Sequence, residues 1–325
     1  MDGEAAGQFD RLEPQCGHEQ HQCEGCPAND LRPRFSARCT SPSAGTSATR
    51  SISSRIAAVP DPAHAAGVSS YGKLCTEFYD IDKPEPPPDA FDFYLAQAER
   101  AGGAILEPMC GSGRFLLPLL ARGFDVVGSD ASPHMLAACR AHARRLGLEP
   151  ALKEERLDAL TNDRRFALIF IPSGSFCLIT DEAAAFAGLV RVRELLVPNG
   201  RFIVEVERRD RTRCSELSGT WGGRWVTRPD GAKIVLSWLS QYVAPSGISS
   251  TLHRYELLKE GRLWAREFED FELKLYELSA FRELLTRAGF SQIQALTPYS
   301  LEPVDEQSCD GEEDGVIFVC SRDAG

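Results

Sequence analysis

The chain has 325 residues, enough for one large domain or two small ones, and 43% of them are hydrophobic, so a sizeable core can form. Its formal net charge of −11 disfavours nucleic acid as a partner, because phosphate contacts need clustered Lys and Arg. No apolar run is long enough to cross a bilayer. The eleven cysteines are odd in number and scattered, which indicates a reduced, cytoplasmic protein without a disulfide framework.

Residues 1–65 differ in composition from the rest of the chain. Residues 31–60 contain five arginines, no acidic residue and many Ser, Thr, Ala and Pro, so we expect this segment to be disordered or to precede the true start of translation. Five potential metal ligands include one pair at zinc-ligand spacing but no second pair, which leaves a zinc site as the less favoured interpretation of Cys16, His18, His21, Cys23 and Cys26.

The next segment carries two tyrosines before a helix predicted at residues 89–101. Tyr71 and Tyr79 precede a proline-rich stretch at 83–88. Aromatic ring faces attract cations, so both tyrosines are candidates for covering a cationic ligand. Packing against neighbouring side chains is an equally good interpretation of them.

A strand, a glycine turn and a helix follow at residues 104–122. The strand ends in Glu107, the turn contains Gly111 and Gly113, and the helix spans residues 114–122. Glycines let the backbone pass close to a ligand, and the new helix points free N–H groups at it. The carboxylate before the glycines favours a cationic or hydroxyl-rich ligand over a pyrophosphate.

A second strand, at residues 124–129, ends in another carboxylate, Asp130. An acidic residue at this place in a doubly wound sheet accepts hydrogen bonds from ribose hydroxyls. Ser132 and Pro133 then begin a helix, with Ser132 as its N-cap. The two acidic strand ends together indicate a nucleoside-binding site.

The run from Glu107 to Gly113 resembles the first motif of the class I S-adenosylmethionine-dependent methyltransferases, acidic-x-Gly-x-Gly-x-Gly, with Met109 in place of the first glycine. The resemblance covers about residues 70 to 325. It implies an enzyme that binds S-adenosyl-L-methionine in a methyltransferase domain at residues 66–325. It assigns cofactor contacts to residues of four segments, namely Tyr71, Tyr79, Glu107, Met109, Gly111, Gly113, Asp130, Ala131, Asp158 and Ala159.

The resemblance also implies the fold class: an α/β, doubly wound, Rossmann-like sheet of seven strands with an antiparallel closing hairpin. The apolar run at residues 166–171 is typical of a parallel strand buried on both faces. A helix at 181–196 and a strand at 201–205 follow. The C-terminal elements expected are a helix at 278–288 and strands at 292–296 and 316–320. A nicotinamide-binding domain would need a third glycine where Leu116 stands.

Residues 207–274 interrupt this order with an antiparallel β insertion, which could be a lid or a dimer element. Ile234, Leu236 and Trp238 alternate along one strand, and residues 259–262 form a hairpin turn. Further strands are expected at 252–258 and 262–271. We expect most of its aromatic residues to lie in the core, a set that comprises Trp221, Trp225, Tyr242, Tyr255 and Trp264.

The predicted reaction is methyl transfer to a small-molecule acceptor, with an amine slightly favoured over a hydroxyl because no histidine stands at an obvious catalytic position. In similar methyltransferases the segment after the fourth strand, here Ser173–Phe176, faces the acceptor. The catalytic candidates are Tyr79, Ser175, Phe176 and His253. A protein or RNA methyltransferase, or a non-catalytic cofactor-binding module, remains the alternative. We expect no membrane partner and leave a homodimer open.

Overall fold

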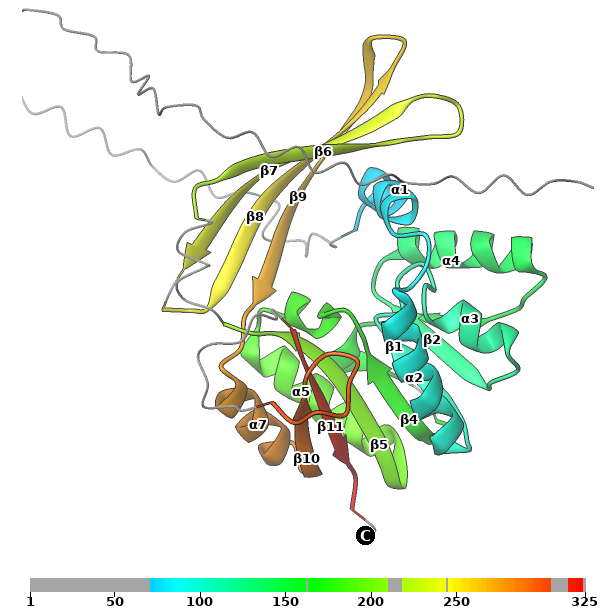
Figure 1. The fold of residues 1–325 in the computed structure, drawn as a ribbon, viewed down its shortest axis with the longest axis vertical. Coiled ribbons are helices and arrows are strands. Elements are labelled where there is room, and N and C mark those ends of the chain that lie inside the picture. Colours follow the sequence, from blue (N-terminus) through cyan, green and yellow to red (C-terminus); the bar gives the residue numbers. More distant parts are fainter. Residues whose placement is uncertain (1–70, 162, 210–217, 244, 305–314, 324–325) are drawn as a thin grey trace, which may run out of the picture. The chain divides into compact units, whose positions relative to one another are not determined.

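Two β-sheets, and helices packed against them, make up the computed structural model, which describes residues 71–161, 163–209, 218–243, 245–304 and 315–323 (Figure 1). The predictions for residues 1–65, including the five potential zinc ligands, lie outside these ranges.

The first sheet has seven strands in the order β10-β11-β5-β4-β1-β2-β3. Strands β1 to β5 run parallel to one another, whereas β11 pairs antiparallel with both β5 and β10. The predicted fold class with its antiparallel closing hairpin is therefore confirmed. The strands are β1 (Ile105–Pro108), β2 (Val126–Asp130), β3 (Ala151–Glu154), β4 (Phe166–Ile171), β5 (Leu196–Glu207), β10 (Ser291–Leu296) and β11 (Gly315–Ser321).

Helices cover both faces of this sheet, as alternate residues of β4 show. Leu168 and Phe170 pack with α2 (Pro88–Ala101), α3 (Leu116–Ala121) and α4 (Pro133–Leu146). Ile169 and Ile171 pack on the other face with α5 (Glu182–Leu195) and α7 (Leu278–Arg287). The continuous apolar run of β4 is buried on both sides, as its sequence predicts.

Side-chain caps fix where two of these helices begin. Ser132 accepts a hydrogen bond from the backbone N–H of Met135, and Pro133 occupies the first position of α4. Asp181 accepts one from the N–H of Ala184 at 2.7 Å and so begins α5. The thiols of Cys110, Cys139, Cys177 and Cys320, which lie in or beside these elements, are buried.

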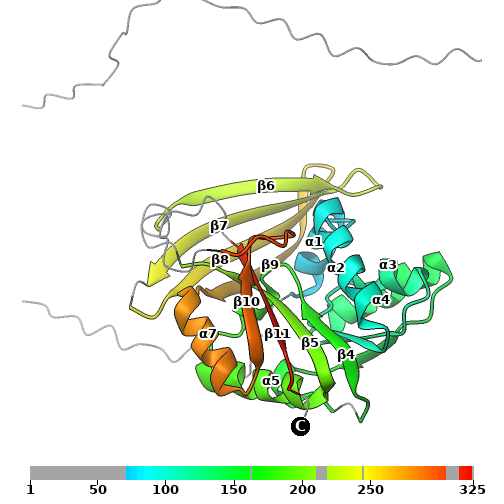
Figure 2. The same ribbon diagram turned by 60° about the horizontal axis from the view of Figure 1, so that its bottom comes forward.

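The insertion folds into a separate antiparallel sheet of four strands in the order β6-β7-β8-β9 (Figure 2). The strands are β6 (Trp221–Thr227), β7 (Lys233–Val243), β8 (Ile248–Lys259) and β9 (Arg262–Lys274). One face buries Ile234, Leu236 and Tyr255 against residues of α1 (Lys73–Asp82). The insertion thus shares a small core with residues 71–82, here called the tyrosine segment.

The expectation that the insertion's tryptophans lie in the core is wrong for three of them. Trp221, Trp225 and Trp264 are 66%, 61% and 63% exposed. Tyr255 is buried as expected, and Tyr242 is half-buried. Sequence alternation distinguishes the two faces of a strand, but it does not say which face another element covers.

Glutamates of β9 cap the N-terminus of α1. The carboxylate of Glu267 accepts hydrogen bonds from the backbone N–H groups of Leu74 and Cys75, at 3.0 and 3.1 Å. Glu269 accepts one from the N–H of Tyr71 at 2.6 Å. These free N–H groups at a helix start favour negative charge. The tyrosine segment is therefore attached directly to the insertion.

Candidate active site

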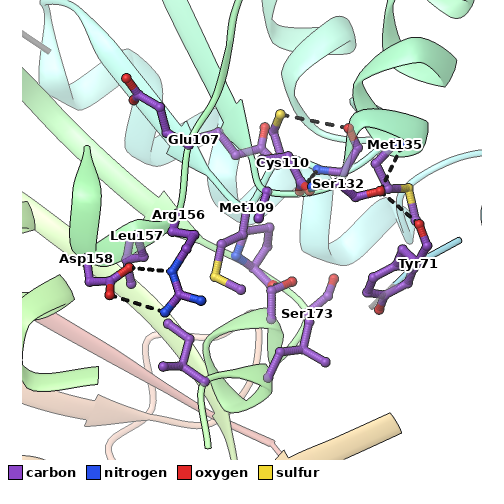
Figure 3. A pocket seen from close by; sticks show the side chains of 18 of the residues that line it. Tyr71, Glu107, Met109, Cys110, Ser132, Met135, Arg156, Leu157, Asp158 and Ser173 are labelled. Carbon is purple, nitrogen blue, oxygen red and sulfur yellow. Dashed lines mark hydrogen bonds and ion pairs between the residues drawn. The ribbon is translucent and has the colours of Figure 1, made fainter. Parts of the chain in front are cut away.

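A cavity of about 490 Å³, here called the glycine-loop cavity, lies at the carboxyl ends of β1, β2 and β4 (Figure 3). Glu107, Asp130 and Pro172 mark these three strand ends among its lining residues. Parallel sheets bind ligands at this edge, where neighbouring strands diverge into loops. The residues singled out in separate segments of the sequence therefore meet at one place.

The turn after β1 adopts left-handed backbone conformations at Met109 and Gly111, with φ of 59° and 55°. A methionine in this region costs roughly 1–2 kcal/mol, which explains why the family pattern has glycine there. At Gly111 the nearest atom to an added Cβ would be Met135 Sδ at 3.8 Å, so the backbone borders open space in the cavity. Gly113 lies away from the lining, packed tightly against Cys139 and Leu117.

Asp130 holds this turn in place. Its Oδ2 accepts a hydrogen bond from the N–H of Gly111, and its Oδ1 accepts one from the N–H of Ser132, both at 2.8 Å. Burial raises the pKa of Asp130, and these hydrogen bonds oppose the shift. Each carboxylate oxygen keeps a further lone pair, which can accept from a ligand hydroxyl. Ala131, the next residue, also lines the cavity.

Glu107 is the most deeply buried carboxylate of the site, with 1% of its surface exposed. Its Oε2 has no hydrogen-bond partner within the described residues. Burial raises its pKa well above the ordinary value, while the positive charge of Arg114 opposes the shift. A buried polar atom without a partner is costly, so Glu107 is suited to a cationic or hydroxyl-bearing ligand.

Arg156 and Asp158 form one wall of the cavity as an ion pair, with Nε to Oδ1 at 3.0 Å (Figure 3). The pairing lowers the pKa of Asp158. Ala159 does not line the cavity, and its N–H donates to Arg156 O within the short helix η2 (Leu157–Ala159). The backbone N–H of Ala159, which was expected to contact the cofactor, is therefore already used inside the protein.

Tyr71 and Tyr79 border the glycine-loop cavity on the side of α1, with their rings edge to face at 6.0 Å. The hydroxyl of Ser132 donates to the carbonyl of Tyr71 at 2.8 Å. His142 of α4 pairs with Asp80 of α1, Nε2 to Oδ2 at 3.3 Å. The tyrosine segment is thus fixed to the first sheet's helices as well as to the insertion.

The segment after β4 divides between the cavity and the core. Ser173 and Ser175 line the glycine-loop cavity, and Arg114 donates to Ser173 Oγ at 2.7 Å. Phe176 is fully buried and packs against Tyr276 and Phe281, with ring centroids 6.1 and 5.5 Å away. The prediction that Phe176 faces the acceptor is therefore wrong, because the short helix η3 (Ser175–Leu178) turns this ring inward.

A second cavity of about 480 Å³ lies between α1 and the inner face of the insertion, and we call it the insertion cavity. Its lining is rich in aromatic rings, including Phe78, Trp238 and Phe271, and it contains His253. Tyr71 and Tyr79 line both cavities, so the two adjoin at this pair of rings. His134, by contrast, is exposed.

These features fit S-adenosyl-L-methionine in four respects. An unpartnered buried oxygen at Glu107 suits a cationic amino group, and Asp130 suits ribose hydroxyls. The backbone at Gly111 leaves room that a side chain would fill. The tyrosine faces suit a sulfonium.

Several lining residues were missed in the sequence, although some carried a signal. Met135 and Ser132 lie on the first turn of α4, which the N-cap pattern places beside Asp130. Helix α1 also has a signal, since Tyr71, Leu74, Cys75 and Phe78 follow helical spacing. The contact of Glu269 with the tyrosine segment has none, because its partners there lie almost 200 residues away, as with Tyr71 at a separation of 198.

Residues 105–200 match a family model described as a methyltransferase domain, which confirms the resemblance found at Glu107–Gly113. A putative methyltransferase from Geobacillus sp. is 24% identical over 251 residues, which span 75% of this chain and 97% of that protein. The ubiquinone biosynthesis O-methyltransferase of Roseobacter denitrificans is 27% identical over 179 residues, spanning 52% of this chain and 64% of that protein.

Solved structures share the fold over most of this chain. An S-adenosylmethionine-dependent methyltransferase from Clostridium acetobutylicum aligns with a TM-score of 0.61 and 18% identity, over 78% of this chain and all of that one. A sugar N-methyltransferase from Streptoalloteichus sp. aligns with a TM-score of 0.60 and 19% identity, over 78% and 96% of the two chains. Among the helices that the structure describes, none has the length and apolarity of a membrane span.

Proposed function

We propose that this chain, as a class I S-adenosylmethionine-dependent methyltransferase, transfers a methyl group to a small-molecule acceptor bound in the insertion cavity. One observation carries the proposal: the glycine-loop cavity and the insertion cavity adjoin at Tyr71 and Tyr79. A donor in the first and an acceptor in the second would meet at these rings.

When bound, S-adenosyl-L-methionine supplies a methyl group on a sulfonium, which is already a good leaving group. We assign Glu107 to its amino group and Asp130 to its ribose hydroxyls. Asp130 also orders the glycine turn through its hydrogen bond to Gly111, so one side chain shapes the loop and contacts the ligand. Alignment of donor and acceptor supplies much of the rate of such a displacement.

The residues around the tyrosines would align the acceptor and keep water out. Arg114 lies over the ring of Tyr79, 5.7 Å from its centroid, and its bond to Ser173 links the tyrosine segment to the loop after β4. Phe271 contacts Tyr71 edge to face at 6.5 Å. The reacting atoms would thus be enclosed by α1, the β4 loop and β9, where exclusion of water brings donor and acceptor into contact.

Charge around the acceptor side favours an amine over a hydroxyl. A third cavity of about 460 Å³ borders the proline-rich turn at residues 83–88 and shares Asp82 and Lys83 with the insertion cavity. Four carboxylates and two cationic side chains line it, namely Asp82, Glu85, Glu205, Glu207, Lys83 and Arg114. The insertion cavity itself is balanced, with Asp82 and Glu269 against Lys83 and Arg224. Since carboxylates attract cations, an acceptor that reaches into the third cavity is a better match if it bears an amine. Proteins named for N- and for O-methylation both occur among the similar ones.

The test is to measure S-adenosyl-L-methionine binding by calorimetry and S-adenosylhomocysteine formation in the presence of a metabolite extract by mass spectrometry. We expect micromolar-range binding and extract-dependent product. Trp238→Ala, which changes the insertion cavity only, should reduce turnover while leaving donor affinity within about threefold, below the 1.4 kcal/mol of a tenfold change. Trp225→Ala, on the same sheet but 61% exposed, is the matched control.

Donor binding without product against any extract would contradict the proposal and favour a non-catalytic module. Product formed only with added protein or RNA would favour a macromolecular acceptor instead. A homodimer remains a prediction, and analytical ultracentrifugation of the full chain would decide it.

A further inference from the structure

The insertion cavity contains a histidine paired with a buried carboxylate. His253 on β8 and Glu269 on β9 face each other in register, with Nδ1 of the ring 3.3 Å from Oε2 of the glutamate. Glu269 is 4% exposed and also accepts hydrogen bonds from Tyr255 Oη, Cys75 Sγ and the N–H of Tyr71. Burial alone would raise the pKa of Glu269, but the hydrogen bonds from His253, the N–H of Tyr71 and Cys75 outweigh it and lower the pKa, so the carboxylate stays charged.

The surroundings decide which ring nitrogen of His253 carries the proton. An anionic oxygen faces Nδ1, so Nδ1 must donate to avoid opposing two lone pairs. The hydroxyl of Tyr255 lies 3.4 Å from Nδ1, and because it donates to Glu269 it can only accept from the ring. The neutral ring therefore has its proton on Nδ1 and its lone pair on Nε2.

The ring of His253 lines the insertion cavity in a fixed orientation. The ring of His253 stacks on Phe271, with centroids 5.0 Å apart and planes 17° apart. Phe271 in turn contacts Tyr71, which borders the glycine-loop cavity. Within the described residues, Nε2 has no hydrogen-bond partner while His253 lines the insertion cavity. A basic nitrogen is thus held one ring away from the tyrosine pair.

We propose that Nε2 of His253 is the base that takes the proton from the methyl acceptor, and that Glu269 is a positioning residue that holds the ring in this tautomer. This rests on the proposed function. The acceptor's lone pair forms the bond to the methyl carbon, the electron pair of the broken carbon–sulfur bond stays on sulfur, and the acceptor's proton goes to Nε2. Solvent removes that proton after the product leaves.

An imidazole suits an ammonium acceptor, whose proton must leave before the nitrogen can attack, better than it suits an unactivated alcohol. The pH dependence of the rate also depends on the other charged and titratable groups that line the insertion cavity with His253. They come from β6 to β9 and from α1, and comprise Arg224, Tyr255, Glu269, Tyr71, Cys75, Tyr79, Asp82 and Lys83. A pH profile must therefore be compared between variants of the same protein.

The competing explanation is structural, because Glu269 also ties β9 to the tyrosine segment. His142 provides a matched control: it pairs with Asp80 at 3.3 Å and joins α1 to α4, and it lines none of the three cavities. His253→Gln removes the pair with Glu269 between β8 and β9, and His142→Gln removes the pair with Asp80 between α4 and α1. Only the first removes a base from the acceptor side.

The experiment measures kcat for S-adenosylhomocysteine formation with the metabolite extract from pH 5.5 to 9, for the full-length wild type and both variants. His253→Gln should lower kcat by about 10²-fold or more and remove the loss of rate at acidic pH, with donor affinity within about threefold. His142→Gln should keep the wild-type profile. Glu269→Gln should lower kcat less than His253→Gln does.

A second measurement needs no acceptor. Side-chain ¹⁵N shifts of histidine, assigned to His253 by comparison with His253→Gln, should show protonated Nδ1 and unprotonated Nε2 in the neutral ring. The opposite tautomer, or wild-type rates and profile in an active His253→Gln, would overturn the assignment alone. No product from the wild type with any extract would overturn the proposed function, and this assignment with it.

Discussion

The donor half of the site and the attachment of α1 beside the proposed acceptor half are built from contacts of very different range. On the donor side, Asp130 reaches Gly111 across 19 residues and Ser132 across two. On the acceptor side, Glu269 reaches Tyr71 across 198 residues and Glu267 reaches Leu74 across 193. Short-range contacts leave a recognisable motif in the sequence, whereas long-range ones exist only once the chain has folded.

The largest expected effect tests whether Phe176 belongs to the hydrophobic core or to the proposed acceptor site. Phe176→Ala should destabilise the protein by about 3–5 kcal/mol, since it removes a fully buried ring packed on Tyr276 and Phe281. For a domain of this size that is roughly a 10 °C fall in melting temperature. Ser175→Ala, one residue earlier and on the cavity lining, is the control. Unchanged stability with lost turnover would return Phe176 to the acceptor site.

Asp130→Ala tests the donor half. It removes a charged acceptor from two backbone N–H groups and from the assigned ribose contact, so donor affinity should fall by about 1–3 kcal/mol, or roughly 5- to 150-fold. Calorimetric titration with S-adenosyl-L-methionine measures this. Asp125→Ala, at the other end of the same strand region and paired with Arg164 at the surface, should leave affinity unchanged. Equal curves for both variants would remove Asp130 from the site.

The pH dependence of donor binding tests the role of Glu107. Its pKa is raised in the free protein, so it stays protonated at pH values where an ordinary glutamate has lost its proton. Binding a cationic amino group requires the carboxylate, so affinity should rise with pH, by at most about 1.4 kcal/mol per pH unit, and a proton should be released. Titrations in buffers of different ionisation enthalpy measure that release, and Glu107→Gln should abolish it.

The same shift predicts how the stability of the free protein depends on pH. A raised carboxyl pKa means that the folded state binds the proton more tightly than the unfolded state. The Glu107 contribution is therefore complete below the ordinary glutamate pKa and is lost as pH rises through the folded value. Glu107→Gln should flatten this part of the stability profile. If the difference in unfolding free energy between the wild type and Glu107→Gln rises with pH over this range, the expected sign is wrong.

The smallest effect concerns the long-range half. Glu267→Gln weakens the cap on α1 and should cost about 1 kcal/mol, a fall of roughly 2–4 °C in melting temperature. Turnover should fall with it, because α1 carries Tyr79 to the boundary of the two cavities. Glu260→Gln, exposed in the hairpin turn of the same sheet, is the control. If both variants behave alike, the cap does not hold α1 in place.

The parts of the fold that were predictable are those in which one residue pattern has one structural meaning. The apolar run 166–171 can only be a buried strand in this context, and Glu107 and Asp130 both follow such strands. Helix α1 was not predicted although its apolar spacing is present, because its N-cap residue Gly72 offers no side-chain cap and neither end carries the usual charge.

Other features depend on contacts that no local pattern encodes. The exposed tryptophans of β6 follow the same alternating pattern that buried ones would follow. Only the position of α1 decides which face of this sheet is covered. Phe176 lies in η3, where its ring packs on Tyr276 and Phe281, two residues about 100 positions away in the sequence. Asp130 and Gly111 of the donor half were predictable from the sequence because these neighbours in space are also near neighbours in sequence.

The two tyrosines shared by the cavities have a thermodynamic consequence. Any ligand that orders or displaces Tyr71 or Tyr79 from one side changes the surface offered to a ligand on the other side. The free energy of this coupling is a property of the pair, so the factor by which donor changes acceptor affinity equals the factor by which acceptor changes donor affinity. The order in which the two substrates bind can then affect the rates of turnover but not this factor.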